Sequence, residues 1–132
     1  MNRMRQEILT AALAPLTADA GVARQQFRFG PAFAGFAGHF PGSPILPAIV
    51  QVLTAVVVAE EAFRRDGPAG WQLVGIENAK FLMQVRPDHE VSVECQLLPP
   101  AGDRRVSKCR LTVGDKVAAS FQLTFAAVAE AG

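Results

Sequence analysis

The spacing of apolar residues changes along the chain, and each spacing predicts an element. Between Arg5 and Ala14 apolar side chains recur at helical spacing, which predicts a short amphipathic helix that ends at Pro15. From Val22 to Phe29 apolar and polar side chains alternate, although imperfectly, which is typical of a strand, and Gly30-Pro31 ends it. The start of the chain therefore predicts one helix followed by one strand.

The most hydrophobic segment runs from Ala48 to Ala59 and is apolar on every side except at Gln51 and Thr54. A helix of this composition is buried. Pro47 suits its first turn, where the missing N–H has no intrahelical partner. Charged residues follow the apolar segment, and Gly67-Pro68 stops the helix. The pattern predicts a buried central helix whose C-terminal end reaches solvent.

The second half of the chain alternates between apolar and polar residues, with turn residues between the segments. One early helix followed by strands in a meander is typical of an α+β fold, in which the helix packs on one face of an antiparallel sheet. The edges of such a sheet need covering, so we expect at least a homodimer. The predicted strands are Trp71 to Ile76, Val91 to Leu97, Val106 to Val113 and Lys116 to Val128.

Composition narrows the function classes. The 132 residues predict a single domain, 1–132, and the hydrophobic half of them is ample for a core. Lys and Arg number 13 against 12 Asp and Glu, which gives no electrostatic reason to expect nucleic acid. The longest apolar run, Val52 to Ala59, is too short to span a bilayer, and the start of the chain lacks the apolar stretch of a signal peptide. We therefore expect a cytoplasmic protein.

The two cysteines, Cys95 and Cys109, form neither a metal-binding spacing nor a disulfide framework. Both fall in alternating segments, so we expect buried free thiols in a reducing compartment. No other residue cluster predicts a metal site, and no motif predicts a cofactor.

The run from His39 to Pro47 holds one of the two histidines among three prolines and a glycine. Proline fixes φ and restricts the residue before it, so this imidazole sits on a stiff loop that leads into the central helix. Leu46, before Pro47, has no side-chain oxygen with which to cap the helix. The first amides of the helix are therefore left for water, backbone or a ligand.

The sequence His39-Phe40-Pro41-Gly42-Ser43-Pro44-Ile45-Leu46-Pro47 resembles the signature loop of the hotdog-fold 3-hydroxyacyl-ACP dehydratases of the FabA/FabZ type. The segment Gly75 to Phe81 resembles a second segment of that family, and the closing three-strand meander also matches. The resemblance implies a hotdog fold, in which an antiparallel sheet wraps around one long buried central helix. It also implies a dimer with active sites at the subunit interface.

The resemblance assigns roles to individual residues. His39 matches the base that removes the α-proton of an acyl thioester, and the N–H groups of Ala48 and Ile49 match the donors that hold the thioester carbonyl. The family's catalytic acid lies fourteen residues after the histidine, on the helix of the other subunit. That position is Leu53 here, and a leucine cannot donate a proton. The resemblance therefore supplies a base and oxyanion donors without the acid.

Gln51, Thr54 and Phe40 each allow a functional and a structural interpretation. Gln51 and Thr54 share one helix face and could hold a water or bind a substrate hydroxyl, or could be helix polarity satisfied across a dimer interface. Phe40 could wall a pocket or belong to the core.

Glu60 lies two turns beyond Leu53, roughly 10 Å along the helix, which is too far to replace the acid. His89 falls in a turn, where we expect it to be exposed.

Three functions fit these residues. The first is a dehydratase or hydratase acting on 3-hydroxyacyl or enoyl thioesters of acyl carrier protein or CoA, with His39 as base. The second is a non-catalytic module that binds acyl thioesters. The third is one half of a heterodimer, completed by a paralogue that carries the acid missing at Leu53. A thioesterase is disfavoured because no carboxylate is suitably placed on the helix.

Overall fold

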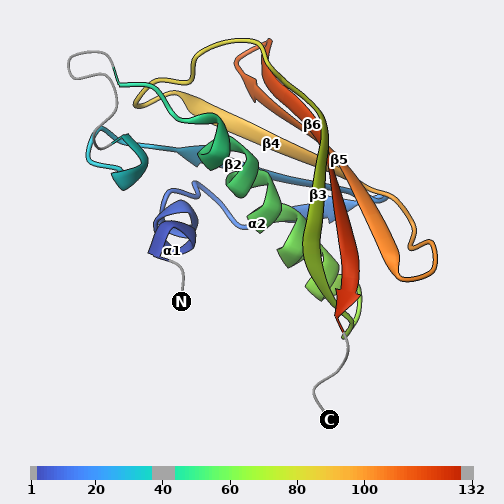
Figure 1. Cartoon of the computed structure of the whole chain (residues 1–132). Coiled ribbons are helices and arrows are strands. Elements are labelled where there is room, and N and C mark those ends of the chain that lie inside the picture. The colour runs from blue at the N-terminus through green and yellow to red at the C-terminus, as the bar shows by residue number, and fades with distance from the viewer. Residues whose placement is uncertain (1–2, 37–43, 129–132) are drawn as a thin grey trace.

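The computed structural model describes residues 3–36 and 44–128. A single antiparallel sheet with the strand order β1-β2-β4-β5-β6-β3 curves around the long helix α2 (Figure 1). The elements are α1 (Arg3–Thr10), β1 (Thr17–Asp19), β2 (Val22–Arg28), the 3-10 helix η1 (Ala34–Phe36), α2 (Ala48–Asp66), β3 (Gly70–Phe81), β4 (Glu90–Leu97), β5 (Arg104–Val113) and β6 (Lys116–Val128).

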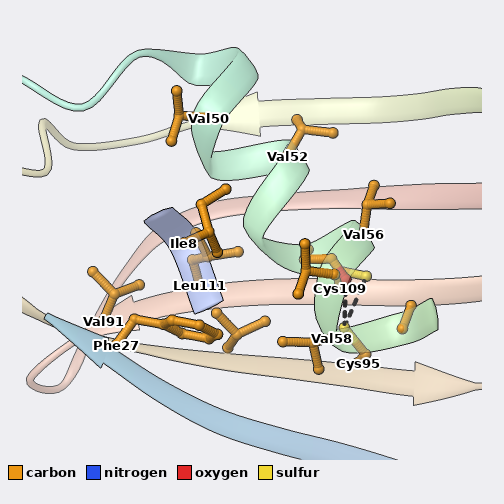
Figure 2. Packing of buried hydrophobic residues seen from close by; sticks show 14 of the residues in the cluster. Ile8, Phe27, Val50, Val52, Val56, Val58, Val91, Cys95, Cys109 and Leu111 are labelled. Atoms are coloured by element: carbon orange, nitrogen blue, oxygen red, sulfur yellow. Dashed lines mark hydrogen bonds between the residues drawn. The ribbon is translucent and has the colours of Figure 1, made fainter. Parts of the chain in front are cut away.

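The core lies between α2 and the inner face of the sheet. The alternating residues of β4, β5 and β6 turn apolar side chains toward α2. Figure 2 shows side chains from α1, β2, β4 and β5 gathered on one side of α2, among them Ile8, Phe27, Val91 and Leu111. The predicted α+β architecture, the buried central helix and the β4-β5-β6 meander are confirmed.

The first helix is shorter than predicted. It ends at Thr10 rather than near Pro15. The next residues pair with the end of β2: the N–H of Leu13 donates to the Gln26 carbonyl at 2.8 Å, and the N–H of Arg28 donates to the Ala11 carbonyl at 3.0 Å. Backbone hydrogen bonds to the sheet thus replace those that would continue the helix. The three exposed residues of β1 have no apolar alternation, and the pattern missed them.

The strand β3 differs most from prediction. It extends from Gly70 to Phe81 and pairs with β6, at the edge of the sheet, instead of continuing the meander into β4. Its second half is exposed throughout, and Asn78, with a φ of 54°, lies within the second of two register shifts in the pairing with β6. An irregular, exposed edge strand loses the alternation of buried and exposed residues, which explains why only Trp71 to Ile76 was predicted.

Candidate functional site

The loop histidine His39 and its neighbour Phe40 lie outside the described residues. The chain before them is held by an aromatic cluster. Phe33 packs against Phe29 with ring centroids 4.6 Å apart and against Phe36 at 5.8 Å. A carboxylate oxygen of Glu7, on α1, accepts the N–H of Ala34 at 3.2 Å. The described chain is therefore held in place up to Phe36.

The chain after the histidine segment is also fixed. Leu46 is buried, and its N–H donates to the Val85 carbonyl at 2.7 Å. Pro47 was predicted in the first turn of α2 but is its N-cap, and the helix begins at Ala48. The Pro47 carbonyl accepts the N–H groups of Val50 and Gln51 at 3.0 and 3.1 Å. The Leu46–Val85 bond joins this loop to the segment after β3, and no sequence spacing indicated that contact.

The start of α2 presents uncapped backbone amides. Pro47 makes no side-chain capping hydrogen bond. The first amides of any helix have no intrahelical acceptor, and in the part of the chain that the structure describes those of Ala48 and Ile49 have no other acceptor either. Both residues are exposed, with Ile49 67% accessible. Amides at a helix N-terminus carry partial positive charge, so they can stabilise negative charge that develops on a carbonyl oxygen.

The buried side chains of Gln51 and Thr54 differ in whether all of their polar atoms have hydrogen-bond partners. Gln51 is 3% exposed, and its Nε2 donates to the Leu46 carbonyl at 3.1 Å. Its Oε1 is buried and has no hydrogen-bond partner among residues 3–36 and 44–128. Thr54 is fully buried and donates to the Val50 carbonyl, one turn back in the same helix, at 2.8 Å. Only Gln51 therefore keeps a buried acceptor in need of a donor.

The position of the missing acid is an apolar one. Leu53 is half-buried, packs against the core, and lies one turn after Ile49 on the same face of α2. Glu60 does not serve this position, because Arg5 of α1 binds its carboxylate at 2.5 and 3.2 Å. Glu61, next along the helix, binds Arg65. The nearest carboxylates on α2 are thus engaged toward its C-terminal end.

Four hollows on the described part of the chain lie away from the start of α2. The largest of four, about 420 Å³, lies between α1, the C-terminal end of α2 and the start of β3, where Arg5, Glu60 and Trp71 line it. None of these four is lined by residues 44–54. At the start of α2, Ala48 and Ile49 are exposed, whereas Val50, Gln51 and Val52 are buried.

The other histidine has a local structural contact. His89 is partly buried, not exposed as predicted, because its Nδ1 accepts the N–H of Arg86 at 3.0 Å within the turn before β4. The thiols of Cys95 and Cys109 are free and buried, as expected. Among the described residues no helix is long and apolar enough to cross a membrane, and no three His, Cys, Asp or Glu side chains group as metal ligands.

Comparison with known proteins identifies the family of the chain. The ApeI-like dehydratase family matches residues 17–122. A 3-hydroxyacyl-acyl-carrier-protein dehydratase FabZ from Levilactobacillus brevis is 33% identical over 96 residues, which cover 68% of this chain and 63% of that protein. The match thus spans less than two thirds of the length of this curated relative.

Solved structures with the same fold come from two kinds of enzyme. The dehydratase heterocomplex ApeI:P from Xenorhabdus doucetiae aligns with a TM-score of 0.70 at 22% identity, covering 87% of this chain and 96% of that one. A thioesterase from Pseudomonas aeruginosa aligns with a TM-score of 0.69 at 16% identity, covering 97% and 95%. At these identities the likeness establishes the fold alone. Together with the family match, it places the chain among the hotdog-fold dehydratases of the FabA/FabZ type, in the ApeI-like dehydratase family.

Proposed function

We propose that this chain acts on 3-hydroxyacyl or enoyl thioesters of acyl carrier protein or CoA, in fatty-acid or polyketide-type metabolism of the cytoplasm. The observation that carries the proposal is the proline-framed His39 segment, which runs directly into the uncapped start of α2 in a chain of the ApeI-like dehydratase family. His39 is the base, and the amides of Ala48 and Ile49 receive the thioester carbonyl.

The proposed reaction uses each group for one task. The His39 imidazole takes the α-proton, and negative charge moves to the thioester oxygen, where helix amides stabilise it. The electron pair then forms the Cα–Cβ double bond while the Cβ–O bond breaks, and the hydroxyl leaves with a proton as water. Phe40 follows His39 directly and is assigned to the acyl pocket.

The proton for the leaving hydroxyl has no acidic donor at Leu53. Loss of a general acid costs roughly 10²–10⁴-fold in rate. The free Oε1 of Gln51 accepts a hydrogen bond from the β-hydroxyl or from a water that supplies the proton. Thr54 is placed in the same site, although its hydroxyl proton already binds Val50. We therefore expect turnover that is slow compared with an acid-bearing dehydratase.

A dimer is part of the proposal. Within the described residues the edge strand β3 pairs on one side, with β6, and it exposes Val74, Ile76 and Phe81. A long apolar edge strand is a template for another strand. We infer that a second subunit pairs along β3, with the start of α2 at the same interface.

The replacement at Leu53 favours a second candidate function. A chain with the base and without the acid fits one half of a heterodimer whose paralogue supplies the acid. The dehydratase in the Xenorhabdus doucetiae structure is named a heterocomplex, which supports this alternative. Co-expression with an acid-bearing hotdog paralogue then gives a mixed dimer that turns over 3-hydroxyacyl thioesters faster than either homodimer. Exclusive formation of homodimers would eliminate this candidate.

The main proposal is tested with purified protein and crotonyl and 3-hydroxybutyryl thioesters in D₂O. Wild type should exchange the substrate α-proton and interconvert the two substrates, and His39→Ala should lose both activities. The matched control is His89→Ala, which removes the chain's other histidine and should retain them. Retained exchange in His39→Ala rules out the assigned base. Thioester binding without exchange in the wild type points instead to a non-catalytic binding module.

The dimer is tested separately by light scattering after size exclusion. Ile76→Lys places a charge on the exposed face of β3 and should give monomers. Leu9→Lys changes a similarly exposed leucine on α1 and should leave the dimer intact. A monomeric wild type would remove the interface from the proposal.

A further inference from the structure

The two cysteines form a close pair in the core, outside the candidate site. Cys95 on β4 and Cys109 on β5 are direct partners in the antiparallel register. Their Sγ atoms lie 3.3 Å apart, and Figure 2 shows the two side chains pointing at one another beneath α2. Directly opposed residues on antiparallel strands have Cα separations of about 4.5–5.5 Å, which lies within the range that disulfides bridge.

The surroundings make the two thiols unequal. Cys95 is fully buried and contacts the Ala55 carbonyl of α2 at 3.7 Å, whereas Cys109 is 4% exposed and lies 3.4 Å from the Ser107 hydroxyl. Hydrogen bonding to Cys109 and burial raise the pKa of Cys95. Hydrogen bonding with Cys95 and with Ser107 lowers the pKa of Cys109. Cys109 is therefore the first of the pair to become a thiolate, the reactive form of a cysteine.

We propose that Cys95 and Cys109 are a reversible oxidation site, at which hydrogen peroxide converts the paired thiols into a disulfide between β4 and β5. The proposal is independent of the acyl-thioester function. Peroxide is the assigned oxidant because it is close to water in size and needs only a small opening. A bulky disulfide reagent would have to fit a mixed disulfide into a packed core.

The reaction balances in two steps. The Cys109 thiolate attacks one peroxide oxygen, the O–O bond breaks, and hydroxide leaves and takes up a proton, so the sulfur is oxidised to a sulfenic acid. The Cys95 sulfur then attacks the Cys109 sulfur, the S–S bond forms, the S–O bond breaks, and the hydroxyl leaves as water with the Cys95 proton. Two thiols and one peroxide thus give one disulfide and two waters.

The geometry favours the second step over further oxidation. The Sγ atoms must approach by roughly 1.3 Å to reach an S–S bond length of about 2 Å. A resolving thiol already in contact captures a sulfenic acid before a second peroxide arrives. A thiol reductant returns the pair to its starting state.

The test treats native protein with hydrogen peroxide, removes the peroxide with catalase, and counts alkylatable thiols after unfolding. Counting thiols is needed because the three methionines also take up oxygen. Wild type should lose both thiols together and regain both with dithiothreitol. Cys95→Ala should instead accumulate oxygen on Cys109. Two thiols that persist after methionine oxidation, or oxygen added separately to both cysteines, would overturn the proposal.

Two further measurements separate native chemistry from oxidation of unfolded chains. The rate of disulfide formation should stay constant in urea below the unfolding transition. A rate that rises with urea in proportion to the unfolded fraction contradicts the proposal. Ser107→Ala removes one hydrogen bond to Cys109 and should slow disulfide formation several-fold without changing far-UV circular dichroism. An unchanged rate removes Ser107 from the site.

Discussion

The two ends of α2 use their polar groups differently. At the C-terminal end, charged side chains find partners within the chain. Arg105 reaches Asp66 at 2.9 Å, and its guanidinium lies over the rings of Phe63 at 4.5 Å and Trp71 at 6.0 Å. Glu60 is held by α1 in the same way. This end is fixed by interactions that the fold completes by itself.

The N-terminal end lacks such internal partners. The amides of Ala48 and Ile49 and the Oε1 of Gln51 have no hydrogen-bond partner within the described ranges, 3–36 and 44–128. A buried acceptor without a donor costs about 1–3 kcal/mol. The C-terminal end thus anchors the helix, and we propose that the N-terminal end keeps its polar groups for a substrate or a second subunit.

The largest expected effect is on stability at the anchored end. Phe63 is 2% exposed and packs edge-on against Phe125 at 5.0 Å, so Phe63→Ala should lower the free energy of unfolding by about 3–5 kcal/mol. Ile49→Ala, at the open end, should change it by less than about 0.5 kcal/mol. Urea unfolding followed by circular dichroism measures both. Similar losses in the two variants would mean that the ends do not differ.

A smaller effect is expected for the ion pair at the C-terminal end of α2. Asp66→Asn should lower the free energy of unfolding by about 1 kcal/mol, because Arg105 is largely buried although Asp66 is exposed. The matched control is Asp103→Asn, which breaks the solvent-exposed pair with Arg104 and should cost almost nothing. Thermal unfolding compares the two variants. Equal costs would show that burial of Arg105 does not strengthen its pair.

Only a small stability change is expected for a substitution at Gln51. Gln51→Leu loses the hydrogen bond to Leu46, worth about 1 kcal/mol, but also removes the unpaired Oε1, so the net change should stay below about 1 kcal/mol. Thioester turnover should nevertheless fall, since the hydroxyl acceptor is gone. Thr54→Val is the comparison variant, because the Thr54 hydroxyl donates within its own helix. A large stability loss with unchanged turnover in Gln51→Leu would make its role structural.

Local patterns predicted the elements whose burial is regular. The apolar stretch after Pro47 predicted α2, because this helix is buried along most of its length. Alternating apolar and polar residues predicted β4, β5 and β6, because one face of each strand is buried along its length. The same patterns could not predict that β3 joins β6, since an edge strand has exposed residues on both faces. The bond from Leu46 to Val85 links distant segments, and no local spacing encodes it.

The sequence predicted the open start of α2 but not the hydrogen-bond partners of the polar side chains near it. The open helix start was predicted from Leu46, which cannot cap with a side-chain oxygen; in the structure the N-cap is Pro47, which also makes no side-chain capping hydrogen bond. Gln51 donates a hydrogen bond to the Leu46 carbonyl, and Thr54 donates to the Val50 carbonyl within its own helix. The sequence does not specify which acceptor each side chain binds. The assignment of His39 rests on the family resemblance and remains a prediction.

The central claim is that the site at the start of α2 lacks only its acid. The most direct measurement is hydration of crotonyl thioester by Leu53→Glu, with Leu53→Gln as a control of similar shape that has no proton to donate. Leu53→Glu should gain roughly 10²–10⁴-fold over wild type. Leu53→Gln should gain little, and adding His39→Ala to Leu53→Glu should abolish the gain. No gain in Leu53→Glu, or an equal gain in Leu53→Gln, would contradict the claim.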